Sequence, residues 1–185
     1  MTWSILARDA EGRLGVAIAS RFFAVGALCV HSRRGVGVLA TQALMNPLYG
    51  PAGLDLLAQG RSAAKVVASL TGADAGRDQR QLHVLPAHGA GAAHTGSACI
   101  EGCGQIVGEG FSVAGNMLAG PGVIAATADA YLRAAHLPLA ELARLHVVSL
   151  ERFQPFMACL PGRRDPVGLT DRAQIEARIA AFSRR

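Results

Sequence analysis

Hydrophobic and polar residues alternate in short runs at the start of the chain. Thr2–Arg8 and Leu14–Ser20 are two such runs, and the turn residues Asp9-Ala10-Glu11-Gly12 between them predict a β-hairpin. Two further apolar runs with β-branched residues follow at 26–31 and 36–42. Strand-like segments in such close succession favour an antiparallel sheet over a β-α-β repeat.

The spacing of apolar residues becomes helical in the middle of the chain. After a proline-containing loop at 46–51, residues 53–59 and 62–70 predict two helices. Gly60 is expected to end the first helix, and Ser62 to be the N-cap of the second.

The later part of the chain returns to short apolar runs. Residues 81–85, 91–97 and 111–114 predict a second group of strands, and 121–135 predict a third helix with Pro121 in its first turn. The order of strands, two helices, strands and helix predicts an α+β fold. Two antiparallel sheets packed face to face between helices, a four-layer αββα sandwich, satisfy this order.

Composition narrows the class of protein. The chain has 185 residues, 51% of them hydrophobic, which predicts one folded domain over residues 1–185. Its net charge is +5, but the basic residues are scattered and form no stripe with aromatics, so nucleic acid is not an expected partner. The longest charge-free stretch, 111–128, contains Asn116, Pro121 and several glycines and is a poor membrane span.

The remaining features of composition concern location and assembly. Charged residues soon after the N-terminus interrupt any signal-peptide pattern, and the four cysteines have no disulfide-framework spacing, so a soluble cytoplasmic protein is expected. The many small residues suit close packing against a second copy of the chain, and we therefore expect a homo-oligomer, first of all a dimer.

Thr2 is the first candidate for chemistry. It follows Met1 and is small enough for methionine removal to be expected, which would place a hydroxyl and a free α-amine on one residue. Because an α-amine has a pKa of about 7.7 to 8.0, part of it is neutral near physiological pH and can take the hydroxyl proton as Oγ attacks a carbonyl. Many chains that begin Met-Thr have no such function.

Several blocks of the sequence resemble one protein family in the same order. They are 1–9 (MTWSILARD), 15–26 (GVAIASRFFAVG), 35–43 (GVGVLATQA), 46–54 (NPLYGPAGL), 76–82 (GRDQRQL), 95–96 (TG) and 115–121 (GNMLAGP). The family is similar to N-terminal-nucleophile (Ntn) hydrolases and is catalogued as domain of unknown function 1028. The resemblance covers about residues 1–135 and implies the four-layer αββα fold. It supports hydrolysis of an amide-type C–N bond of a small molecule by Thr2, without a cofactor; a non-catalytic scaffold or binding protein is the alternative.

Arg21 and Ser20 end the second predicted strand, next to Thr2 if the hairpin forms. Arg21 is a candidate catalytic residue that lowers the pKa of the amine or binds a substrate carboxylate, although a structural ion pair is an equal alternative. Ser20 is a candidate substrate-binding residue.

Thr41, Gln42 and Asn46 lie at another strand end and are candidates to line the same cleft, or else turn-forming residues. Asn116 follows a strand, and its amide is a candidate oxyanion donor, the alternative being a turn residue with an unusual φ.

Metal and nucleotide sites have weaker support. Cys99 and Cys103, with His88 and His94 upstream, suggest zinc, but no second pair of ligands has the required spacing, so no metal site is predicted. The glycine pairs lack the residues that complete a nucleotide-binding motif.

The chain departs from the family pattern beyond about Leu139. Residues 140–185 form an atypical ending, as in a truncated, frameshifted or diverged member. Residues 147–150 are expected to form a replacement strand, and 171–182 an amphipathic helix.

Overall fold

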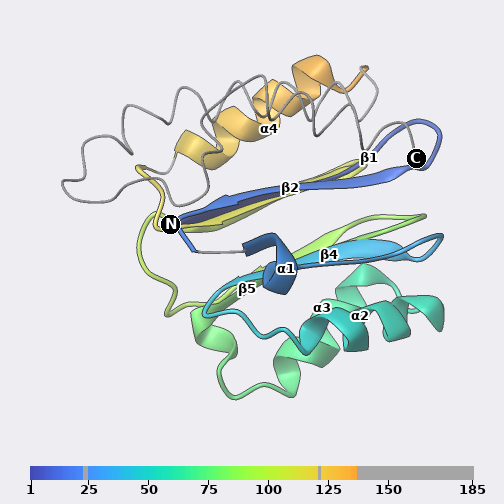
Figure 1. Cartoon of the computed structure of the whole chain (residues 1–185), viewed down its shortest axis with the longest axis horizontal. Helices are drawn as coiled ribbons and strands as arrows, with labels where there is room; N and C mark the ends of the chain where they lie inside the picture. Colours follow the sequence, from blue (N-terminus) through green and yellow to red (C-terminus); the bar gives the residue numbers. More distant parts are fainter. Residues whose placement is uncertain (23–24, 121, 137–185) are drawn as a thin grey trace. The chain divides into compact units, whose positions relative to one another are not determined.

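The computed structural model describes residues 1–22, 25–120 and 122–136, which lie within one compact unit, Met1–Leu139 (Figure 1). The strand predicted at 147–150 and the helix predicted at 171–182 lie outside the described residues.

The first sheet is built around the N-terminal hairpin. Strand β1 (Thr2–Arg8) pairs antiparallel with β2 (Leu14–Ser20), as predicted. Gly12 closes the turn with a φ of 78°, in the left-handed region that glycine occupies without a β-carbon clash. On its other side β1 pairs with β8 (Phe111–Asn116), which pairs with β7 (Gly104–Gly108), giving the order β2-β1-β8-β7.

The second sheet contains β3 (Val30–Arg33), β4 (Gly37–Ala43), β5 (Arg80–Pro86) and β6 (Ala92–Thr95) in that spatial order, again all antiparallel. The early strand-like segments are thus divided between two sheets. The strand predicted at 26–31 is wrong in part, because its first residues belong to a short helix, α1 (Val25–Cys29), before β3 begins.

Two helices cover the outer face of the second sheet, α2 (Tyr49–Ala58) and α3 (Ala63–Gly72), and a 3₁₀ turn, Arg77–Gln79, leads into β5. The Ser62 hydroxyl caps α3 by accepting a hydrogen bond from the Lys65 amide, as predicted. The helix α4 (Gly122–Ala134) packs on β7 and β8 of the first sheet (Figure 1). Within the described ranges, no helix has both the length and the apolar character needed to cross a membrane.

Hydrophobic side chains fill three zones of the fold. One lies between α2, α3 and the second sheet, and includes Leu39, Leu54 and Val66; another lies under α4 around Val113. The third lies between the sheets around Leu6 and Leu85. Because side chains alternate along a strand, β1 sends Thr2, Ser4 and Leu6 towards the second sheet. The predicted α+β class with two antiparallel sheets is therefore confirmed.

Candidate functional site

Thr2 begins the central strand β1 and lies opposite two other candidate residues. The register pairs it with Ser20 of β2 on one side and Asn116 of β8 on the other. Residues directly opposite each other in antiparallel strands project from the same face of the sheet. The three side chains therefore gather at one end of the space between the sheets.

The Ser20 hydroxyl connects Thr2 to the first residue of the chain. It donates to the Met1 carbonyl at 3.0 Å and accepts from the Phe22 amide at 3.0 Å. The oxygens of Thr2 and Ser20 are also 3.0 Å apart. Since the Ser20 proton is used towards Met1, the Thr2 hydroxyl is the donor in this contact.

The α-amine of Met1 contacts the Met117 sulfur at 3.5 Å. Partial burial of this amine lowers its pKa, and the positive charge of Arg21 lowers it further. Arg21 is exposed and has no hydrogen bond or ion pair with another described residue. Its influence on the N-terminus is therefore through charge.

Asn116 is only 3% exposed, and its amide nitrogen donates to Gln81 Oε1 at 2.9 Å. The same oxygen accepts from Gln42 Nε2 at 3.0 Å. Gln42 Oε1 in turn accepts from the Ser4 hydroxyl at 2.7 Å, and Ser4 Oγ lies 2.9 Å from His83 Nε2. A continuous chain of buried polar groups thus runs between the two sheets.

Burial lowers the pKa of His83 to about 3, so its ring is neutral at physiological pH. Because Ser4 gives its proton to Gln42, His83 Nε2 carries a hydrogen and donates to Ser4. His83 Nδ1 then accepts from the Ser112 hydroxyl, 3.1 Å away. From Ser112 through His83, Ser4 and Gln42, each donor points towards Gln81, and Asn116 donates to the same Gln81 oxygen from the other end.

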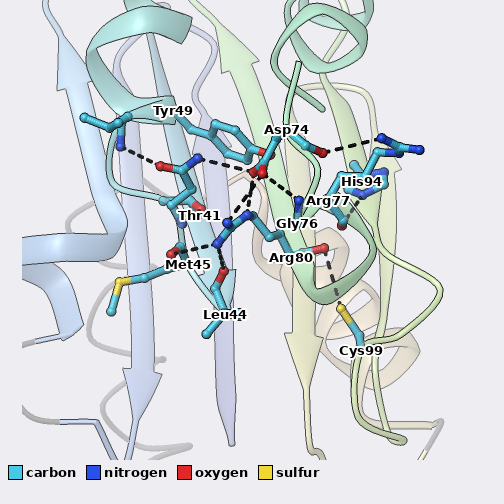
Figure 2. A network of polar contacts seen from close by, with 12 residues as sticks. Thr41, Leu44, Met45, Tyr49, Asp74, Gly76, Arg77, Arg80, His94 and Cys99 are labelled. Carbon is cyan, nitrogen blue, oxygen red and sulfur yellow. Dashed lines mark hydrogen bonds and ion pairs between the residues drawn. The ribbon is translucent and has the colours of Figure 1, made fainter. Parts of the chain in front are cut away.

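Thr41 and Asn46 belong to a different network, centred on Asp74 (Figure 2). Thr41 Oγ1 accepts from the Asn46 backbone amide at 3.1 Å, and the Asn46 side chain donates to Asp74 at 3.3 Å. The Tyr49 hydroxyl donates to Asp74 at 2.6 Å, and Arg80 forms an ion pair with the same carboxylate. Thr41 alternates with Gln42 along β4, so their side chains project from opposite faces of the sheet.

The Asp74 network orders the loop that follows β4. The hydrogen bond from Tyr49 is the main cause of a lowered pKa at Asp74, while burial raises the pKa of Tyr49. Arg80 also donates to the Leu44 and Met45 carbonyls at 2.6 and 3.2 Å. A hollow of about 340 Å³ lies beside this network, lined in part by Tyr49 and Asp74, and not beside Thr2.

Cys99 and Cys103 are not surrounded by further metal ligands from the described residues. Cys103 Sγ contacts the Cys99 carbonyl at 3.9 Å, and Cys99 Sγ contacts the Arg80 carbonyl at 3.5 Å. No group of three or more His, Cys, Asp or Glu side chains in the described part of the chain is placed to hold a metal ion.

The structure therefore brings together Thr2, Ser20 and Asn116 directly, and links Gln42 to them through Gln81. Sequence reasoning missed the buried polar residues Gln81 and His83. The sequence does contain a weak indication of them, because both lie on the same face of a strand whose other residues are mostly apolar. Polar residues in such a position need hydrogen-bond partners once they are buried.

Comparison with known proteins agrees with the resemblance. Residues 2–148 match the family of unknown function DUF1028, somewhat beyond the expected limit near residue 135. A crystal structure of a protein from Silicibacter pomeroyi, described as a DUF1028 member, is 32% identical with a TM-score of 0.68. The match covers 71% of this chain and 59% of that one, so this chain spans less than two thirds of its relative. No protein of curated function matches. The chain belongs to the DUF1028 family.

Proposed function

We propose that this member of the DUF1028 family is an N-terminal-nucleophile hydrolase that cleaves an amide-type C–N bond of a small molecule. Thr2 is its nucleophile after removal of Met1. The observation that carries the proposal is the register of β1, which places Thr2 between Ser20 and Asn116 at the end of the inter-sheet space. In this proposal the two sheets and their covering helices are the αββα sandwich of such hydrolases.

The reaction needs only groups of the chain, the substrate and water. The free amine of Thr2 takes the hydroxyl proton as Oγ1 attacks the carbonyl carbon. The C–N bond then breaks, the proton passes to the leaving nitrogen, and the acyl group remains as an ester on Oγ1. Water, deprotonated by the same amine, attacks the ester and releases the acid, which restores the Thr2 hydroxyl.

Neighbouring side chains have defined roles in this scheme. Asn116 Nδ2 uses one hydrogen towards Gln81, so its second hydrogen is available to the developing oxyanion. Arg21, whose positive charge lowers the pKa of the Met1 amine, is expected to act in the same way on the Thr2 amine after processing and to bind an anionic group of the substrate. Ser20 loses its Met1 acceptor on processing, so its hydroxyl can contact the Thr2 amine or the substrate.

The first test is the mass of the intact protein followed by reaction with a β-lactone, a small electrophile that acylates a nucleophilic hydroxyl. We expect loss of one methionine, and then one acyl group on Thr2 after peptide mapping. Thr2→Ala should abolish this adduct, and Thr2→Ser should retain it, because a serine hydroxyl can attack in the same way.

Two results would contradict the hydrolase. Retention of Met1 would leave Thr2 without its amine base, and equal labelling of the Thr2→Ala protein would place the reactive group elsewhere. Either result would favour a non-catalytic scaffold. In the structure, the Met1 carbonyl is held by Ser20 and its amine contacts Met117, contacts that a retained Met1 would keep. Two expectations from the sequence stay predictions: that the protein is cytoplasmic, and that it forms a homodimer.

A further inference from the structure

The side-chain amide of Gln81 is the point where the two sheets are joined beside Asn116. It is fully buried on β5. Its oxygen accepts from Gln42 at 3.0 Å and from Asn116 at 2.9 Å. Its nitrogen donates to the Gly115 carbonyl at 2.8 Å, and lies 3.1 Å from the Gly104 carbonyl.

These contacts determine which way the Gln81 amide points. The carbonyls of Gly104 and Gly115 accept hydrogen bonds and cannot donate, so Nε2 must face them and Oε1 must face Asn116. Nε2 also lies 3.0 Å from Thr95 Oγ1, whose proton goes to Gln105 Oε1 at 2.9 Å. A rotation of the Gln81 amide by 180° would place its oxygen against two carbonyl oxygens, which cannot donate a hydrogen bond to it.

The orientation of Asn116 follows from that of Gln81. Because Gln81 presents an acceptor, the nitrogen of Asn116 must face it, and one of its two hydrogens is used there. The other hydrogen leaves the same nitrogen at a fixed angle. The donors that run from Ser112 through His83 and Ser4 to Gln42 end on the Gln81 oxygen and oppose a flipped state.

We propose that Gln81 is a positioning residue for the hydrolysis: it orients the Asn116 amide so that its free N–H is held ready beside Thr2. This inference rests on the proposed function, and assigns part of that function to a residue that does not itself touch the substrate. Preorganised donors are effective because they require no reorientation during the reaction.

The test compares acylation of Thr2 by the β-lactone in Gln81→Met, Asn116→Ala and the double variant. Methionine has a similar length but no amide, so we expect a fall in the maximal acylation rate of about tenfold or more, with the half-saturating probe concentration unchanged. Because both residues act through one group, the double variant should react no more slowly than Asn116→Ala alone. Thr71→Val removes a buried hydrogen bond on α3, away from the space between the sheets, and as the control it should react as the native protein does.

A second measurement reads the orientation without any reaction. The ¹⁵N–¹H₂ resonances of the Asn116 side chain should move in Gln81→Met, and return towards the native positions in Gln81→Glu, whose buried carboxyl retains an acceptor oxygen. If a folded Gln81→Met protein is acylated at the native rate, or if its Asn116 resonances do not move, the positioning role is overturned. The proposed hydrolase function would not be affected by either result. If the native protein is not acylated, the hydrolase fails, and the resonances still decide whether Gln81 orients Asn116.

Discussion

Two residues with a β-carbon have a left-handed backbone at strand ends. Ala43, with a φ of 63°, follows Gln42 at the end of β4, and Met117, with a φ of 54°, follows Asn116 at the end of β8. This conformation costs about 1 to 2 kcal/mol in a residue other than glycine. The strain therefore lies directly beside the buried amides of the inter-sheet network, where a sharp change of chain direction ends each strand.

The strain at Ala43 can be measured by substitution with glycine. Ala43→Gly should remove about 1 to 2 kcal/mol of backbone strain from the folded state. Glycine also makes the unfolded chain more flexible, which costs about 0.5 to 1 kcal/mol of stability, so the two effects should offset each other. We expect no loss in the free energy of unfolding, measured in urea. Ala68→Gly, at an exposed position inside α3, is the control and should lose about 1 kcal/mol. Equal losses in the two variants would show that Ala43 is not strained.

The candidate residues were predictable from sequence to different extents. The turn after β1 determines the hairpin register, so the pairing of Thr2 with Ser20 follows from local pattern. Asn116 could be singled out as a polar residue at a strand end, but its place opposite Thr2 depends on a long-range strand pairing that spacing does not reveal. Gln81 and His83 are read simply as strand residues, because their partners come from the other sheet.

At the scale of elements, the Asp74 carboxylate connects the loop after β4, the start of α2 and the start of β5 through Asn46, Tyr49 and Arg80 (Figure 2). The hydrogen bond from Tyr49 is the main cause of the low pKa of Asp74. A carboxyl whose pKa is lowered on folding stabilises the fold above its unfolded value, and this contribution is lost as the pH falls through the folded value. The network should therefore be strongest at neutral pH.

Tyr49→Phe removes the phenolic donor and little else. We expect a loss of about 2 kcal/mol in the free energy of unfolding at pH 7, as for other hydrogen bonds to charged groups. Because the unfolded chain titrates identically in both proteins, this loss should persist while Asp74 is ionised in both folded states and should shrink only as the pH falls towards the pKa of Asp74 in the folded variant. Tyr131→Phe is the matched control, because the Tyr131 hydroxyl has no hydrogen-bond partner among the described residues. A loss at Tyr49 no larger than the loss at Tyr131 would contradict the link to Asp74.

The elements themselves were predicted well where their pattern is long. The hairpin, α3 and α4 lie close to their expected limits. Helix α2 begins earlier than predicted, because Pro51 is tolerated in a first turn and does not keep the preceding residues out of the helix. The short elements α1 and β7 were missed, since five residues are too few to show a period.

At the scale of the whole described unit, the two sheets are joined by polar as well as apolar contacts. Ser4 and Ser112 of the first sheet bind His83 of the second from either side. A buried network of this kind stabilises one arrangement of the sheets only while every member has its partner. The sequence predicts the apolar part of this interface from strand alternation, but the polar part depends on the relative placement of the sheets, which no local pattern contains.

Protonation of His83 should therefore destabilise the unit as the pH falls. Its pKa is about 3 in the fold, because burial disfavours the charged ring, and about 6.5 in the unfolded chain. Between these values the unfolded state binds the extra proton, so the stabilising contribution is complete above about pH 6.5 and declines below it.

We expect His83 to account for a loss of about 2 kcal/mol in the free energy of unfolding between pH 7 and pH 5. His83→Gln lacks the titrating group and should lose that much less over this range, even if it is less stable at pH 7. Urea unfolding at the two pH values measures both proteins. An equal loss in the variant and the native protein would mean that His83 does not stay neutral between the sheets.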